Sequence, residues 1–124
     1  MTLIIDCHGH FTTEPQKHHD FRKAQVAYAE GQKPERPVYP GISDAELSVI
    51  VEGNQLRLQK ERGSVLTIIS PRASGMGHHI GDLDIAIEWA TISNDCVKRI
   101  VDLFPENFAG VCQLPQSPGA RRGH

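Results

Sequence analysis

The N-terminal stretch 3–10, Leu-Ile-Ile-Asp-Cys-His-Gly-His, constrains this 124-residue chain more than any other segment. Leu3, Ile4 and Ile5 are apolar on both faces of an extended chain, which predicts a central strand of a parallel sheet covered by helices. Side chains alternate along a strand, so His8 and His10 point the same way. They lie at the carboxyl end of the strand, where barrels of parallel strands carry their active sites.

Imidazole nitrogens are good zinc ligands, so we expect His8 and His10 to bind a metal ion. The alternative is an ordinary hydrogen-bonded pair, because a chain with seven histidines can contain His-x-His by chance. The position of the pair, between an apolar strand and a polar loop, favours the metal site.

The rest of the chain alternates between helical and extended patterns. Helices are predicted at 15–30, 43–62 and 82–104, the second from a capping box of Ser43 and Glu46 and the third from Asp82 as its cap. Further strands are predicted at 64–69 and 108–114. Each crossover is long enough to return the chain in parallel, which predicts an α/β fold of β-α-β-α-β order within one domain, 1–119.

Two adjacent histidines fall in the first helix. His18 and His19 point about 100° apart on a helix and cannot address one metal ion, so we expect both to be solvated. The helix itself has only a partial apolar stripe, which predicts loose packing on the outside.

Composition excludes several classes of function. With 39% hydrophobic and 23% charged residues the chain is typical of one soluble globular unit. Its formal charge of −2 does not indicate the basic surface that binds nucleic acid. No apolar run approaches the length of a membrane span. Three cysteines, Cys7, Cys96 and Cys112, show no Cys-x-x-Cys spacing and predict reduced, buried thiols in a cytoplasmic protein.

The loop 70–81 follows the second strand and contains three glycines and a proline. It is expected at the same edge of the sheet as His8 and His10. Arg72 can bind a substrate carboxylate through two parallel hydrogen bonds, although a surface arginine in a loop is the alternative.

The opening Ile-Ile-Asp-Cys-His-Gly-His resembles the first strand of the amidohydrolase superfamily, whose members hold metal with a His-x-His pair in a (β/α)8 barrel. Further segments are similar to those of 4-oxalomesaconate hydratases, the zinc-dependent hydratases of the protocatechuate 4,5-cleavage route of aromatic breakdown. The most specific are Ser-Pro-Arg-Ala-Ser at 70–74 and His-His-Ile-Gly-Asp at 78–82. The others lie at 42–44, 52–56, 60–64 and 114–119.

The resemblance implies that His8 and His10 are ligands of Zn²⁺ and that water is added across an enol or alkene conjugated to carboxylates. It makes Ser70, Arg72 and His79 candidates for binding a small tricarboxylic or dicarboxylic substrate, in a chain that can form a homo-oligomer. The catalytic acid or base and the further metal ligand belong to later strands of the family's barrel.

A (β/α)8 barrel needs about 250 residues, whereas three strands are predicted here. We therefore expect the N-terminal part of a barrel, truncated after the third strand, with a divergent tail at 120–124 and no activity by itself. Two alternatives remain: a non-catalytic remnant that binds a partner through its open strand edge, and another metal-dependent hydrolase or decarboxylase of the amidohydrolase type.

Overall fold

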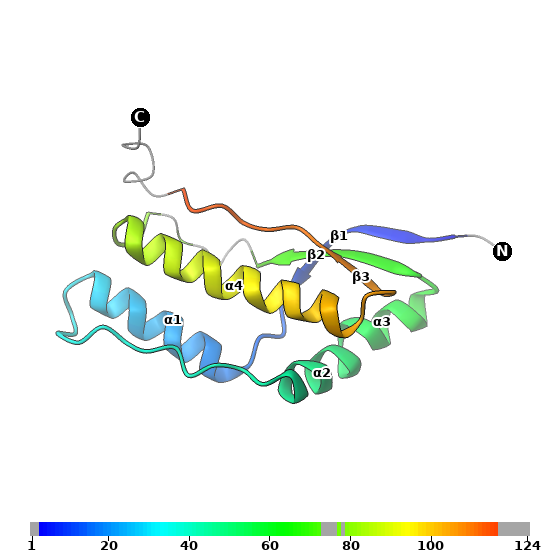
Figure 1. Cartoon of the computed structure of the whole chain (residues 1–124), viewed down its shortest axis with the longest axis horizontal. Helices are drawn as coiled ribbons and strands as arrows, with labels where there is room; N and C mark the ends of the chain where they lie inside the picture. The colour runs from blue at the N-terminus through cyan, green and yellow to red at the C-terminus, as the bar shows by residue number, and fades with distance from the viewer. Residues whose placement is uncertain (1–2, 73–76, 78, 117–124) are drawn as a thin grey trace.

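Three short strands form one parallel sheet in the order β1-β2-β3: β1 (Ile5–Phe11), β2 (Leu66–Pro71) and β3 (Phe108–Gly110). The computed structural model describes residues 3–72, 77 and 79–116. Figure 1 shows the three strands beside the helices. In the register of β1 and β2, Ile5 pairs with Leu66 and His10 with Ser70. The predicted parallel β-α-β-α-β order is confirmed, whereas the third strand is shorter than predicted. The tail at 120–124 lies outside the described residues.

The helices follow the strands in the predicted places: α1 (Gln16–Ala29), α2 (Asp44–Gly53), α3 (Gln55–Arg62) and α4 (Leu83–Leu103). At the start of α2 the Glu46 amide donates to Ser43 Oγ over 3.1 Å, and the Ser43 amide donates back to the Glu46 carboxylate. The Ile85 amide donates to Asp82 Oδ1 at the start of α4. Both predicted caps are confirmed.

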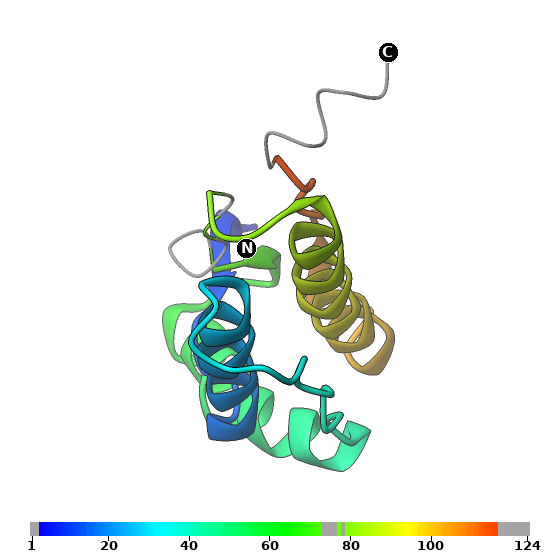
Figure 2. The same ribbon diagram turned by 90° about the vertical axis from the view of Figure 1, so that its left-hand side faces the viewer.

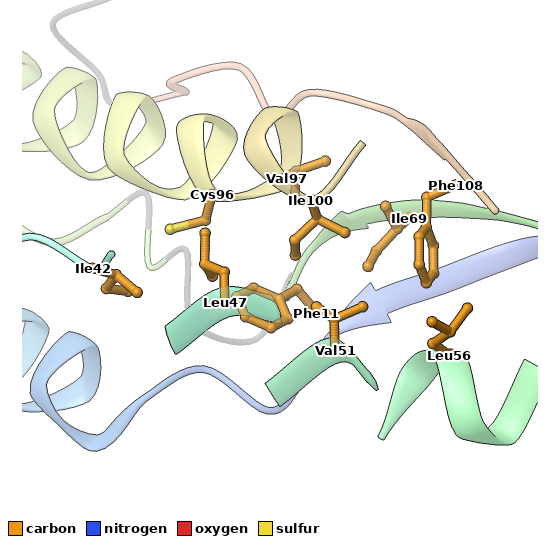
Figure 3. Packing of buried hydrophobic residues seen from close by; sticks show 10 residues of the cluster. All are labelled: Phe11, Ile42, Leu47, Val51, Leu56, Ile69, Cys96, Val97, Ile100 and Phe108. Carbon is orange, nitrogen blue, oxygen red and sulfur yellow. The ribbon is translucent and has the colours of Figure 1, made fainter. Parts of the chain in front are cut away.

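The main core lies between the sheet and the helices (Figure 3). The strands contribute Phe11, Ile69 and Phe108 to this core, each no more than 2% exposed. The core also contains buried residues from α2, α3, α4 and the loop before α2, including Ile42, Leu47, Val51, Leu56, Cys96, Val97 and Ile100. Because side chains alternate along a strand, His10 and Ser70 belong to the opposite face of the sheet.

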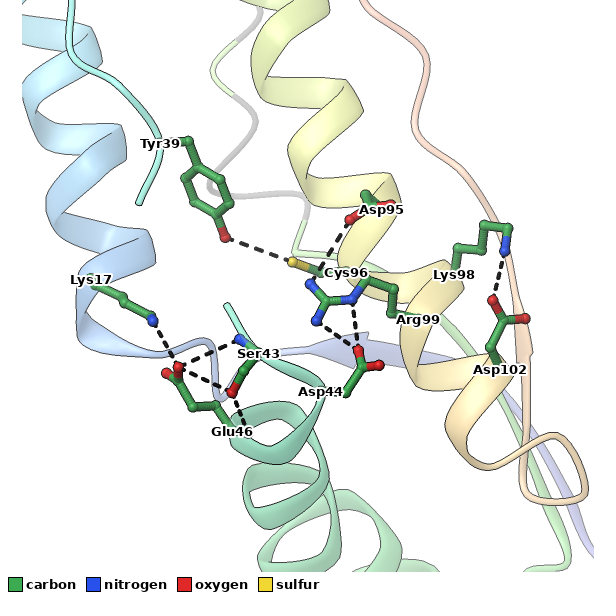
Figure 4. Close-up of polar contacts among 10 residues, drawn as sticks. All are labelled: Lys17, Tyr39, Ser43, Asp44, Glu46, Asp95, Cys96, Lys98, Arg99 and Asp102. Carbon is green, nitrogen blue, oxygen red and sulfur yellow. Dashed lines mark hydrogen bonds and ion pairs between the residues drawn. The ribbon is translucent and has the colours of Figure 1, made fainter. Parts of the chain in front are cut away.

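Ion pairs at the surface join the helices to one another (Figure 4). Arg99 of α4 reaches Asp44 at the start of α2, with 2.7 Å between Nη2 and Oδ1. Lys17 of α1 reaches Glu46 of α2, with 2.8 Å between Nζ and Oε1. These exposed pairs add little to the stability of the fold, because solvent screens the attraction between exposed charges.

The N-terminal apolar run is not buried as predicted. Leu3, Ile4 and Ile5 are 70%, 44% and 48% exposed. The reason is the strand order, in which β1 is an edge strand that pairs with β2 alone within the described sheet. The apolar pattern suits a central strand, but the described residues supply neither a second neighbour nor a cover for its outer side.

The segment 43–62 is two helices and not the single predicted one. The break falls at Asn54, whose backbone leaves the helical region at φ −127° and ψ −87°. Its side-chain amide donates to the Ile50 carbonyl over 2.8 Å and its backbone N–H donates to the Val51 carbonyl. Gly53 and Asn54 both have weak helix propensity, and the amide of Asn54 satisfies a carbonyl at the end of α2.

The first helix is packed more closely than its apolar stripe predicted, because polar side chains complete its inner face. His18 is only 2% exposed, so the expectation of a solvated His18 is wrong, whereas His19 is exposed. The His18 ring lies 4.7 Å from the Trp89 ring, centre to centre, and its Nδ1 is 3.0 Å from the Tyr39 hydroxyl. Both views place α1 beside α4 (Figures 1 and 2).

Burial of the thiols is confirmed for one of the three cysteines. Cys96 is buried in α4, while Cys7 on the edge strand and Cys112 after β3 are exposed because no described segment covers them. All three are free thiols. No helix in the described part of the chain is long and apolar enough to cross a membrane.

Candidate functional site

The two histidines of the N-terminal motif converge as alternation predicts. Their Nε2 atoms are 3.1 Å apart, and their ring centres are 4.8 Å apart with the ring planes nearly perpendicular. Two nitrogens each about 2.0–2.1 Å from one metal ion in tetrahedral geometry lie about 3.3–3.4 Å apart. The pair therefore fits two adjacent coordination positions of a zinc ion after a shift of a few tenths of an ångström.

The opposite edge of the His10 ring is held by β2. Its Nδ1 lies 2.9 Å from Ser70 Oγ and 3.3 Å from the Pro71 carbonyl oxygen. Ser70 Oγ in turn donates to the Gly9 carbonyl over 3.2 Å. Ser70 was expected to contact substrate; the structure places its hydroxyl behind His10.

Gly9 between the histidines allows the two strands to approach. A Cβ atom at this position would lie 2.7 Å from Thr67 Cγ2 and 3.2 Å from the Ile68 carbonyl oxygen. Both distances are below ordinary van der Waals contact, so a side chain at this position would force β1 or β2 to shift. The His-Gly-His spacing thus depends on this close contact as well as on the histidines.

On the first strand the described residues offer a metal ion two histidine nitrogens. They contain no cluster of three or more His, Cys, Asp or Glu side chains that could hold a metal ion. Asp6, on the same strand, accepts a hydrogen bond from the His8 backbone N–H over 3.1 Å. His78, another histidine of the loop, lies outside the described residues.

Arg72 comes directly after β2 and lines a cavity of about 580 Å³ on the side of α1. The cavity also contains Glu14, His19, Arg22 and Lys23 among its lining residues. Arginine and lysine around a cavity suit an anionic ligand, and the binding of a substrate carboxylate by Arg72 stays a prediction. Residues 73–76 of the expected substrate loop lie outside the described residues.

Glu14 is a polar residue of this region that sequence reasoning missed. Its side chain is only 9% exposed, and its Oε2 has no hydrogen-bond partner among the described residues, although His19 Nε2 lies 3.4 Å away. Burial raises the pKa of Glu14, while the positive charges of His19 and Arg72 act in the opposite direction. A glutamate before a helix-starting proline carries no signal of this in the sequence.

His79, the third candidate for substrate binding, is exposed. The structure thus brings His8, His10 and Ser70 together and places Arg72 at the same end of the sheet.

The fold and the site define a parallel α/β unit with a metal-compatible histidine pair on its first strand. No family model matches the chain. The chain is 54% identical over 120 residues to the 2-keto-4-carboxy-3-hexenedioate hydratase of Sphingobium sp. strain SYK-6, which covers 97% of the chain and 35% of that relative.

A solved structure gives the same result. The crystal structure of the 4-oxalomesaconate hydratase LigJ from Rhodopseudomonas palustris matches 94% of the chain with a TM-score of 0.83 and 44% sequence identity. The match covers 35% of that protein, in the N-terminal part of its fold. The resemblance found in the motifs is confirmed: the chain is homologous to 4-oxalomesaconate hydratases and spans about a third of their length.

Proposed function

We propose that this chain forms the first three strands of a (β/α)8 hydratase of the amidohydrolase type, which adds water to 4-oxalomesaconate in the protocatechuate 4,5-cleavage route. The identity of 54% to a hydratase over 97% of the chain carries the proposal. Composition and fold alone are compatible with many activities, so the aligned sequence is what selects this one.

The uncovered face of the sheet supports the barrel. In a (β/α)8 barrel helices cover the outer face of the sheet and the inner face is filled by side chains of the other strands. Ile5 and Leu66 are paired on the face opposite the core, where Ile5 is 48% exposed and Leu66 half-buried. Further strands of a barrel would cover these apolar residues.

Within this proposal His8 and His10 hold the zinc ion, with their Nε2 atoms as ligands. A bound zinc ion supplies Lewis-acid polarisation of a substrate oxygen or a water of lowered pKa. Arg72, at the carboxyl end of β2, binds a substrate carboxylate and orients it. The general acid or base and the remaining metal ligands come from strands that correspond to the other two thirds of the relatives.

A chimera tests the proposal. Residues 1–116 of this chain replace the corresponding segment of the Sphingobium hydratase, and hydration of 4-oxalomesaconate is followed by ultraviolet absorbance. We expect hydratase activity and bound zinc, both lost on combining His8→Ala with His10→Ala. Asp102→Asn, an exposed change on α4, is the control that leaves both unchanged.

One observation favours a second candidate, a non-catalytic chain that binds a partner through its strand edge. The outer edge of β1 is unpaired among the described residues, and Leu3 and Ile4 beside it are exposed. A well-folded chimera that binds no zinc and hydrates nothing would refute the hydratase and leave this candidate.

A further inference from the structure

Three hydrogen-bond contacts connect His10, Ser70, Pro71 and Gly9 on the Nδ1 side of the His10 ring. His10 Nδ1 faces Ser70 Oγ at 2.9 Å and the Pro71 carbonyl oxygen at 3.3 Å. The Ser70 hydroxyl lies 3.2 Å from the Gly9 carbonyl oxygen. The three partners come from both strands, because His10 and Ser70 are paired in the register of β1 and β2.

The chemistry of these groups determines which ring nitrogen carries the proton. Carbonyl oxygens accept and never donate, so the contact with Pro71 requires a proton on His10 Nδ1. The contact of Ser70 with Gly9 uses the single hydroxyl proton of Ser70, which leaves the Ser70 oxygen to accept from Nδ1–H. One arrangement therefore satisfies all three contacts, and it leaves His10 Nε2 with a free lone pair.

We propose that Ser70 is a positioning residue that holds His10 in the Nδ1–H tautomer and presents its Nε2 toward His8. The inference rests on the proposed function for its purpose, since a metal ligand must offer an unprotonated nitrogen. A hydrogen bond from the other ring nitrogen is the usual way to fix the orientation and tautomer of a metal-binding histidine. Ser70 then acts through His10 and not on the substrate.

His8 and His10 differ in the hydrogen-bond partners of their Nδ1 atoms. No described residue bonds to His8 Nδ1, and His8 Nε2 lies 3.1 Å from His10 Nε2. Because His10 Nε2 has no proton in this arrangement, His8 Nε2–H is the donor of that contact in the metal-free chain. His10 is ready to bind a metal ion, whereas His8 must first give up its Nε2 proton.

Nitrogen-15 NMR of the metal-free chain tests the tautomer directly, at about pH 8 where imidazoles are neutral. The one-bond and long-range couplings of the ring protons distinguish a protonated Nδ1 from a protonated Nε2. We expect His10 to be the Nδ1–H form in the wild type and to lose part of its Nδ1–H population in Ser70→Ala, where only the longer contact with the Pro71 carbonyl remains. Ser70→Thr keeps a hydroxyl and should restore the wild-type spectrum.

Thr67→Val is the matched control. It removes a hydroxyl from the same strand, on the face where Thr67 Oγ1 accepts from Gln59 Nε2 at 2.9 Å, and should leave the His10 tautomer unchanged. An Nε2–H form of His10 in the wild type would overturn the proposal without any variant. A Ser70→Ala spectrum identical to wild type would overturn it as well.

Metal binding provides a separate measurement. In the chimera we expect Ser70→Ala to weaken zinc affinity about 10- to 100-fold, the usual loss when the outer partner of a metal-binding histidine is removed, with Ser70→Thr close to wild type. If the tautomer behaves as expected while the wild-type chimera binds no zinc, the proposed function fails and the positioning role of Ser70 stands. Unchanged zinc affinity in Ser70→Ala would refute its role in metal binding.

Discussion

The number of ligands that His8 and His10 of β1 can offer limits how tightly this chain alone can bind a zinc ion. Two nitrogens would fill only half of the tetrahedral coordination sphere of a zinc ion, and the described residues contain no cluster of three or more candidate ligands. We expect the untagged chain to bind zinc with micromolar affinity or weaker, and the double change His8→Ala with His10→Ala to abolish the signal in calorimetry. An unchanged isotherm would contradict the assignment, and tight binding by the intact chain would reveal ligands such as His78.

His18 makes the stability of the chain depend on pH. Burial, with a smaller contribution from the charge of His19, lowers the pKa of His18 from 6.5 to about 4. The unfolded histidine takes up its proton near pH 6.5 and the folded one near pH 4, so stability is present above pH 6.5 and is lost as the pH falls toward 4. The loss amounts to about 3 kcal/mol.

Urea denaturation of the wild type and of His18→Phe between pH 7 and pH 4 measures this loss. The phenyl ring retains the contact with Trp89 but cannot titrate. Between pH 7 and pH 4, the free energy of unfolding should therefore fall by about 3 kcal/mol more in the wild type than in His18→Phe. Parallel pH profiles of the two proteins would contradict the prediction. The NMR titration of His18 should have its midpoint near pH 4.

Substitution of Arg72 tests whether this residue binds a substrate carboxylate in the proposed enzyme. In the chimera Arg72→Lys keeps the charge but cannot form two parallel hydrogen bonds with one carboxylate. We expect KM for 4-oxalomesaconate to rise about 10- to 100-fold with a smaller effect on kcat, from the loss of a hydrogen bond between charged groups. Arg57→Lys, an exposed change on α3, is the control. Wild-type kinetics would show that Arg72 serves only the loop or Glu14.

The part of the candidate site that lies on a single strand could be predicted from the sequence. Alternation along the first strand places His8 and His10 together without knowledge of any neighbour. The position of Ser70 behind His10 depends on the register between β1 and β2, which a single sequence does not specify. Burial of Glu14 likewise depends on α1 packing over the chain that follows β1.

At the level of secondary-structure elements, the pairing of β1 with β2 depends on the missing side chain of Gly9. Gly9→Ala would place a Cβ 2.7 Å from Thr67 Cγ2 and should lower the free energy of unfolding by about 1–3 kcal/mol, the usual cost of overpacking. Gly53→Ala at the end of α2 meets no atom within 4 Å and is the control. It should be neutral or slightly stabilising.

A second variant distinguishes crowding from a backbone effect at Gly9. Thr67→Ser removes Cγ2 and retains the hydroxyl that contacts Gln59, so the double variant with Gly9→Ala should recover part of the lost stability in urea denaturation. If Gly9→Ala alone is as stable as wild type, the close approach of the strands does not limit this position. If the double variant recovers nothing, the clash with the Ile68 carbonyl dominates.

Helices were easier to predict than strands because their signals are local. The caps of α2 and α4 and the extent of α4 follow from residues a few positions apart. The break at Asn54 was missed because the apolar positions of α2 and α3 continue in nearly the same helical period across it. The exposure of β1 was missed because burial of a strand depends on neighbours that the apolar pattern implies and the described sheet does not contain.

At the scale of the whole molecule, the described residues form a sheet that helices cover on one face. Its helices bury Phe11, Ile69 and Phe108 against the core, while the other face carries His10, Ser70 and the half-exposed apolar residues paired across β1 and β2. Unpaired strand edges and uncovered apolar surface favour association. We therefore expect this 124-residue polypeptide to associate on its own, as sedimentation velocity can show, and the chimera to associate less.

The same geometry predicts that the 124-residue polypeptide alone does not hydrate 4-oxalomesaconate. Turnover needs a metal ion held by several ligands and an acid or base within about 2.6–3.2 Å of the proton that it moves, and the described residues offer two ligands on one strand. Purified chain with added zinc, assayed beside the full-length Sphingobium hydratase, should show no turnover above the zinc blank. Removal of groups that act as a unit costs more than a hundredfold, so a rate within about a hundredfold of the full-length enzyme would mean that these strands contain a complete catalytic site.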